Sequence, residues 1–180
     1  MSPYIPKDDV AVILDFGCGD GGIIKEMRFI NPKAKYIGFD VSDVALEKAS
    51  ASLPGAEFHK IVDGEPFPIE DEQVDFIFSS EVIEHVYDTE NAFSEMARIL
   101  RPGSCLLITT PYHGFLKNLL IVFFAFDRHF NLTGPHVRFF LRRSLLTCLR
   151  KVGLEPLAYG HFGRFWPIQH CIFVLAKKGY

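Results

Sequence analysis

The sequence predicts an α/β fold in which a mostly parallel sheet carries helices on both faces. Three observations support this fold class. Short apolar segments rich in β-branched residues alternate with amphipathic segments of helical period. Several apolar segments end in an acid that is followed by Gly, Ser or a short loop. Hydrophobic residues make up 48% of the chain and include 18 phenylalanines, which indicates a sheet covered on both sides.

The length and composition predict a single domain over residues 1–180. A net charge of -3 argues against a broad nucleic-acid footprint, although local basic patches are compatible with it. The four cysteines have no Cys-x-x-Cys spacing, so we expect free buried thiols in a reducing compartment. Residues 1–9 lack the apolar core of a secretion signal, which favours a cytoplasmic protein. The longest apolar run, residues 119–126, is far shorter than the roughly 20 residues that span a bilayer.

The first strand and helix are expected at residues 10–14 and 23–30. Between them lies the pattern G-x-G-x-x-G, formed by Gly17, Gly19 and Gly22. In such a turn the backbone comes close to a ligand, and free N–H groups at the helix N-terminus point towards it. Asp15 does not suit a pyrophosphate, because both groups are anionic, but it suits an ammonium or sulfonium group. A tight turn without any ligand is the alternative.

The alternation of strand and helix continues after residue 30, so consecutive strands are expected to run parallel. Strands are expected at residues 35–40, 56–62, 74–78 and 104–110, and helices at 43–53 and 89–100. Asp40 ends the second strand, where an acid accepts hydrogen bonds from ribose hydroxyls in nucleotide-binding folds. An N-cap role for Asp40 or Ser42 is compatible with this, and Asp63 is alternatively a plain turn residue. Asp15, Asp40 and Asp63 all fall at the carboxyl ends of strands, where the nucleotide is expected.

The regular order breaks between residues 112 and 140, which we expect to form a variable acceptor or lid region. Residues 115–126 predict a helix that is apolar around most of its circumference. It is either buried against the sheet, a lid over a hydrophobic substrate, or a face that lies on a membrane or partner. A basic helix at residues 142–152 and a closing pair of strands at 154–160 and 168–176 complete the chain.

Two motifs resemble class I S-adenosylmethionine-dependent methyltransferases: D-x-G-x-G from Asp15, and VDFIFSSEVIEHV from Val74. The turn Arg101-Pro102-Gly103 before an apolar strand is also typical of that family. The resemblance spans roughly residues 12–111 and implies a Rossmann-like, mostly parallel seven-stranded sheet with a C-terminal antiparallel hairpin. Family members usually carry a helix before the first strand, whereas about ten residues precede it here. This fits a minimal enzyme, a fragment, or a site that a partner completes.

The same resemblance implies S-adenosylmethionine as cofactor and S-adenosylhomocysteine as product. It implies that Asp40 binds the ribose, that Val41 packs on the adenine, and that Asp63 binds the adenine amino group. The cofactor-binding residues that we expect are Asp15, Gly17, Cys18, Gly19, Asp40, Val41, Asp63, Gly64 and Ser80.

A second group of candidate residues is Glu81, Glu84 and His85. If a helix begins just after Ser80, positions i, i+3 and i+4 lie on one face and form a partial site for Mg²⁺ or Mn²⁺. The ion would lower the pKa of a bound acceptor hydroxyl. Alternatively, the acids stabilise a helix N-terminus without metal, and His85 acts as a general base without an ion.

The motif E-x-x-E-H resembles that of two groups of metal-assisted O-methyltransferases. One group acts on ubiquinone intermediates and the other on the terminal ribose 2′-hydroxyl of small RNAs. The RNA group implies one more histidine, for which His136 is the nearest counterpart and His113 a rival. The candidate catalytic residues are therefore Glu81, His85, His113 and His136. The candidate metal ligands are Glu81, Glu84, His85 and His136.

The function expected from these motifs is methyl transfer to an oxygen of a small or lipid-like acceptor. One alternative is an RNA 3′-end 2′-O-methyltransferase, for which the only basic cluster is at residues 138–151. Another is an NAD-dependent dehydrogenase, which would use the glycines and Asp40 in the same way but leaves Asp15 unexplained. A non-catalytic binding module is the third. The sequence indicates neither the acceptor's identity nor the oligomeric state.

Overall fold

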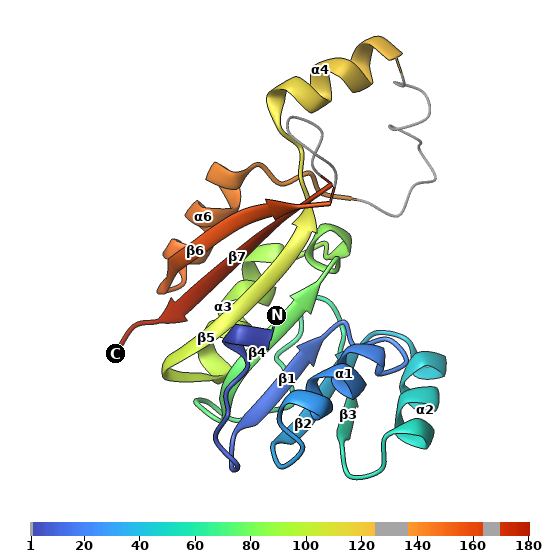
Figure 1. Ribbon diagram of the computed structural model, residues 1–180. Coiled ribbons are helices and arrows are strands. Elements are labelled where there is room, and N and C mark those ends of the chain that lie inside the picture. The colour runs from blue at the N-terminus through green and yellow to red at the C-terminus, as the bar shows by residue number, and fades with distance from the viewer. Residues whose placement is uncertain (1, 125–136, 164–169) are drawn as a thin grey trace.

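The computed structural model describes residues 2–124, 137–163 and 170–180 (Figure 1). Seven strands form one sheet in the order β3-β2-β1-β4-β5-β7-β6. The neighbours from β3 to β5 are parallel, whereas β7 is antiparallel to both β5 and β6. This confirms the expected Rossmann-like, mostly parallel sheet with an antiparallel end. The strands are β1 (Val12–Phe16), β2 (Lys35–Asp40), β3 (Glu57–Lys60), β4 (Val74–Ser80), β5 (Leu100–Pro111), β6 (Leu154–Phe162) and β7 (Cys171–Lys178).

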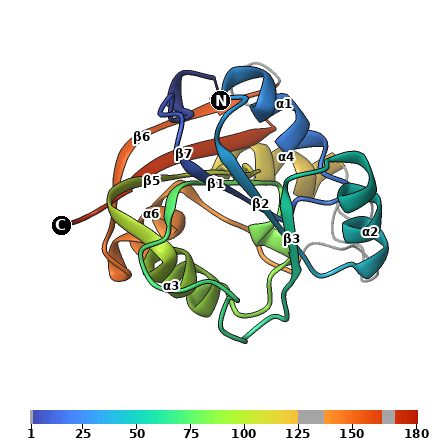
Figure 2. The ribbon, with the colours of Figure 1, turned by 90° about the horizontal axis from the view of Figure 1, so that it is seen from below.

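The helices divide between the two faces of the sheet (Figure 2). One core layer contains buried side chains of α1 and α2, and the other contains those of α3 and α6. Each layer packs against strand residues that alternate between the two faces, which explains the near-continuous apolar runs of the central strands. The helices are α1 (Gly22–Ile30), α2 (Asp43–Ser52), α3 (Thr89–Ile99), α4 (Phe115–Phe124) and α6 (Arg142–Lys151), with 3-10 turns η1 (Ser2–Tyr4) and η2 (Ile83–His85).

The helix starts follow from local chemistry. The Ser42 hydroxyl accepts the Ala45 N–H at the start of α2, and the Asp88 carboxylate accepts the Asn91 N–H at the start of α3. By contrast, the N-cap residue of α1 is Gly21, which has a φ of 85° and offers no side-chain cap. The first helix therefore depends on the glycine turn, whereas the next two are capped by side chains.

Several expected boundaries were wrong, among them those of the first and fifth strands. The first strand runs from Val12 to Phe16, and Val10 is exposed before it. The fifth strand begins at Leu100 and includes Arg101-Pro102-Gly103, which the sequence predicted to be a turn. The physical reason is cross-strand support: Leu100 pairs with Val74 before the register shifts, and the Arg101 guanidinium donates to both oxygens of Asp75 at 2.7 Å.

Candidate functional site

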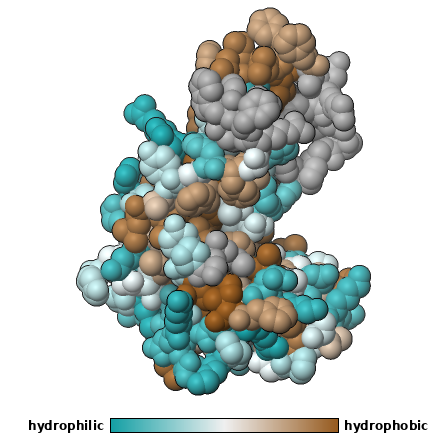
Figure 3. All heavy atoms as spheres, in the orientation of Figure 1, coloured by the Kyte–Doolittle hydropathy of each residue, from teal (hydrophilic) through white to brown (hydrophobic). Residues whose placement is uncertain are grey.

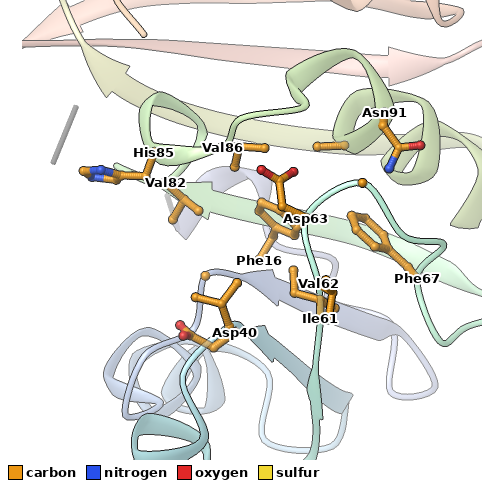
Figure 4. Close-up of a pocket in the computed structure, with 14 residues that line it drawn as sticks. Phe16, Asp40, Ile61, Val62, Asp63, Phe67, Val82, His85, Val86 and Asn91 are labelled. Atoms are coloured by element: carbon orange, nitrogen blue, oxygen red, sulfur yellow. The ribbon is translucent and has the colours of Figure 1, made fainter. Parts of the chain in front are cut away.

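The candidate site is a pocket at the carboxyl ends of the central strands (Figure 4). After β1 the chain goes on to β2 on one side, whereas β4 lies on the other, so the connections leave the sheet in opposite directions. Ligands of open α/β sheets bind at such a point. The pocket holds about 620 Å³ of space including its open mouth.

Apolar side chains form most of the pocket wall. The Phe67 ring lies 5.5 Å from the Phe16 ring and 5.4 Å from the Phe39 ring, which fixes it across the ends of β1 and β2. Ile61, Val62, Val82 and Val86 complete this wall from the segments after β3 and β4. The pocket therefore offers an apolar surface of the kind that suits an aromatic base.

Two carboxylates line the same pocket. Asp40, at the end of β2, accepts the Gly19 N–H at 2.8 Å through one oxygen and the Ser42 N–H at 2.9 Å through the other. Asp63 accepts the Tyr87 N–H at 2.6 Å and the Asp88 N–H at 3.2 Å. Each carboxylate retains lone pairs beyond these bonds, because two oxygens offer about four acceptor positions. Both acids are thus held rigidly and can still accept from a ligand.

Five N–H groups of the glycine turn already have partners within the protein. Gly17 and Cys18 both donate to the Phe39 carbonyl, at 2.8 and 2.9 Å, and Gly19 donates to Asp40. Gly21 donates to the Cys18 carbonyl at 2.9 Å, and Gly22 donates to the Asp20 side chain at 3.3 Å. These donors hold the turn against β2 and leave it unlike a pyrophosphate cradle.

Asp15 lies behind this turn, with 2% of its surface exposed. One carboxylate oxygen, Oδ2, is buried and has no hydrogen-bond partner. Burial raises the pKa of Asp15 to about 7, and the negative charge of Asp40 adds to the effect. A buried carboxylate without a donor is costly unless a cation reaches it, so Asp15 fits an ammonium-bearing ligand.

The remaining expected cofactor residues divide into two groups. Gly17, Val41 and Gly64 line the pocket. Cys18 is buried beside Gly38, where an added Cβ would come within 2.7 Å of its sulfur, and burial raises the pKa of this thiol to about 12. The Ser80 hydroxyl pairs with that of Thr109 at 2.9 Å. Neither Cys18 nor Ser80 lines the pocket.

The expected helix just after Ser80 is absent from this part of the structure. Glu81 has a φ of 56°, and only the short 3-10 turn η2 follows, so Glu81, Glu84 and His85 do not share a helical face. Glu81 accepts hydrogen bonds from the Thr109 hydroxyl at 3.1 Å and the Cys171 thiol at 3.4 Å. These contacts hold its carboxylate on the β5 and β7 side.

The other two residues of this group, Glu84 and His85, lie in different surroundings from Glu81. The Glu84 carboxyl is buried, accepts the Thr110 hydroxyl at 3.1 Å, and has its pKa raised by that burial. His85 lines the pocket, and its Nε2 lies 3.9 Å from Glu84 Oε1. Within the described ranges, no three His, Cys, Asp or Glu side chains gather closely enough to hold a metal ion. His136 falls outside the described residues.

His113 is buried after β5, and its ring lies 4.7 Å from the Phe139 ring in an edge-to-face arrangement. It does not line the pocket. The backbone N–H groups of Val137 and Arg138 both donate to the Glu84 carbonyl at 3.0 Å. The end of the variable region is thereby tied to η2, close to His85.

Sequence reasoning missed the residues that hold the Phe67 loop. Arg98 on α3 donates to the carbonyl oxygens of Phe67 at 3.1 Å and Ile69 at 2.8 Å, and to the Asp71 and Glu95 carboxylates at 2.7 Å. Glu95 in turn accepts the Phe67 N–H at 2.7 Å. The only local signal was the i, i+3 spacing of Glu95 and Arg98, which is common on solvated helices. Asn91, which also lines the pocket, carried no signal.

Comparison with known proteins agrees with this geometry. The family model described as a methyltransferase domain matches residues 1–159. Malonyl-[acyl-carrier protein] O-methyltransferase of Methylococcus capsulatus is 31% identical over 150 residues, covering 82% of this chain and 53% of that protein. Trans-aconitate 2-methyltransferase of Azoarcus sp. is 33% identical over 107 residues, covering 59% of this chain and 42% of that protein.

The fold comparison gives the same result. An S-adenosylmethionine-dependent methyltransferase from Mesorhizobium loti superposes with a TM-score of 0.78 at 16% identity, covering 98% of this chain and 94% of that one. The chain spans about half the length of the first of these curated relatives. The family match over most of the chain and the shared fold lead to one conclusion: the chain belongs to the class I S-adenosylmethionine-dependent methyltransferases.

Proposed function

We propose that the pocket binds the adenosine part of S-adenosylmethionine and that the protein transfers its methyl group to an oxygen of a small or lipid-like acceptor. The observation that carries this proposal is Asp15. Its buried, unpartnered oxygen stands behind a turn whose N–H donors are already used. That combination disfavours a pyrophosphate and favours a ligand with an ammonium group.

The pocket supplies a partner for each part of such a ligand. The adenine would lie against the apolar wall that includes Phe16 and Phe67, and Asp40 would accept hydrogen bonds from the ribose hydroxyls. Asp63 would face the adenine edge from the other end of the pocket. Asp15 would pair with the ammonium group of the methionine part. S-adenosylmethionine brings an already activated methyl group, so the protein's contribution is to position the acceptor in line with it.

The residue best placed to take the acceptor proton is His85. Its imidazole lines the pocket beside Glu84, whose carboxylate orients and stabilises a protonated ring. Glu81 stands on the β5 and β7 side, where Thr109 and Cys171 hold it. The relatives named above, a malonyl-[acyl-carrier protein] O-methyltransferase and a trans-aconitate methyltransferase, support an acceptor of this kind. The described residues contain no group of three metal-ligating side chains, so no step of the proposal is assigned to a metal ion.

Isothermal titration calorimetry tests the proposal directly. Purified protein is titrated with S-adenosylhomocysteine and with NAD, each in magnesium, in manganese and in EDTA. We expect binding of S-adenosylhomocysteine alone, with the same affinity in all three buffers. Binding of NAD, or no binding of S-adenosylhomocysteine, would contradict the cofactor assignment. An affinity that EDTA lowers, and that Glu84→Ala makes insensitive to EDTA, would restore the metal-assisted mechanism.

A matched pair of variants locates the binding site. Asp40→Ala removes the carboxylate that lines the pocket and should weaken S-adenosylhomocysteine binding by about 100-fold or more. Asp43→Ala removes an acid three residues away that pairs with Lys60 outside the pocket, and should leave the affinity unchanged. Equal effects of the two substitutions would place the ligand elsewhere.

A further inference from the structure

Helix α4 is an apolar element without a packing partner in the described part of the chain. It stands clear of the sheet beyond the end of β5 (Figure 1), and none of its residues is buried. Its sequence, FLKNLLIVFF, contains no acid and one charge, Lys117. Phe123 and Phe124 at its end are 71% and 83% exposed. Figure 3 shows the resulting apolar surface at the top of the molecule.

The exposed apolar side chains of α4 extend around more than half of the helix circumference, at 100° per residue. Lys117, Asn118 and Ile121 are half-buried on the remaining side of the helix. A wide apolar arc of this kind is typical of a helix that lies in the surface of one leaflet. The helix is about 15 Å long at 1.5 Å per residue, and no helix in the described ranges is long and apolar enough to cross a bilayer.

Basic side chains lie beside the start of this helix. Arg142 and Arg143 at the start of α6 line a hollow together with Phe115, the first residue of α4. Both arginines are exposed, and Arg142 lies over the Tyr159 ring at 4.9 Å. Although the chain has a net charge of -3, two positive charges thus lie beside the first residue of its exposed apolar helix.

We propose that α4 and the arginines at the start of α6 form a docking surface for an anionic lipid bilayer. The helix enters the interfacial layer of one leaflet, while Arg142 and Arg143 meet the acidic headgroups. The apolar helix supplies the binding free energy, and the arginines supply the preference for anionic lipid. The inference needs neither cofactor nor methyl transfer, so it stands or fails separately from the proposed function.

Vesicle flotation tests this inference with the protein as it exists. The protein is mixed with phosphatidylcholine vesicles, with and without phosphatidylglycerol, and the bound fraction is measured. We expect binding to the vesicles that contain phosphatidylglycerol and weak binding to phosphatidylcholine alone. The double variant Phe123→Ser with Phe124→Ser should lower the partition coefficient by about 100-fold. The matched control, Val10→Ser with Phe29→Ser, removes two side chains that are each 78% exposed on other parts of the surface, and should change nothing.

The charge contribution is tested by reversal. Arg142→Glu with Arg143→Glu should lower binding to phosphatidylglycerol vesicles by at least about 10-fold, whereas Lys25→Glu with Lys48→Glu on α1 and α2 should not. Far-UV circular dichroism and a thermal melt show that each variant is folded. Absence of vesicle binding, or binding that the phenylalanine variant retains, overturns the proposal. A dimer in sedimentation velocity that the same variant converts to monomer, without vesicle binding, assigns the helix to a second copy instead.

Discussion

Replacing Asp15 by Asn should stabilise the protein in the absence of cofactor, and increasingly so as the pH rises. Asp15 has a pKa of about 7 in the folded state, against an ordinary value of 3.8. Because the folded value is higher, the folded state binds the proton more tightly than the unfolded state between these two pH values. Its contribution to stability is therefore most favourable below pH 3.8 and is lost as the pH rises to about 7.

The size of the effect follows from the shift. A difference of about 3 pKa units corresponds to roughly 4 kcal/mol at full ionisation, at about 1.4 kcal/mol per unit. At pH 5 the unfolded state is already ionised and about 1.7 kcal/mol of this cost is present. Asparagine keeps the shape of the side chain and carries no charge. The difference in unfolding free energy between Asp15→Asn and wild type should thus widen by about 2.5 kcal/mol between pH 5 and pH 8.

Urea denaturation of both proteins at pH 5, 6, 7 and 8 measures this difference. Glu26→Gln on the exposed surface of α1 is the control for losing one negative charge, and its difference from wild type should stay constant. A constant difference for Asp15→Asn as well would show that the carboxylate is ionised without cost in the folded protein. The reasoning on an unpartnered buried oxygen would then be refuted, and with it the main support for an ammonium ligand.

Three further outcomes are expected. S-adenosylhomocysteine should bind about 10-fold more weakly at pH 6 than at pH 8 by calorimetry, because protonated Asp15 no longer attracts an ammonium group, and Asp15→Asn should abolish this dependence. Gly17→Ala should lower the unfolding free energy by about 2–4 kcal/mol in urea, because its φ is 80° and the new Cβ would lie 2.2 Å from Val82. Adding Val82→Ala should recover roughly half of that loss, and no recovery would assign it to the backbone alone. Arg98→Ala should weaken S-adenosylhomocysteine binding by about 10-fold through a loosened Phe67 loop, whereas an unchanged affinity would show that the loop holds without it.

The edge of the sheet that carries the pocket could be predicted from the sequence. Asp15, Asp40 and Asp63 each fall at the end of an apolar run, and parallel strands bring such ends to one edge. In the structure Asp40 and Asp63 line one pocket, whereas Asp15 is buried and does not line it. Local periodicity was sufficient here because the relevant contacts are set by strand direction alone.

The Glu81 segment could not be predicted in the same way. A positive φ is unfavourable for a glutamate, so the neighbouring residues contain no sequence signal that predicts it. Its N–H donates to the Thr109 carbonyl at 3.0 Å, and its side chain meets Thr109 and Cys171. These partners lie far away in sequence, on β5 and β7. The position of Phe67 has the same kind of cause, since Arg98 and Glu95 on α3 hold its backbone.

Several N–H groups of the glycine turn already donate to acceptors within the protein, and this affects how readily the site could change its ligand. Removing the acid at Asp15 would abolish a repulsion towards phosphate, yet the N–H groups of Gly17, Cys18 and Gly19 would still be directed at Phe39 and Asp40. A dinucleotide would gain no donor from that single step. Conversion of this pocket would require the turn and the end of β2 to change together, so the two segments are expected to vary as one unit over evolutionary time.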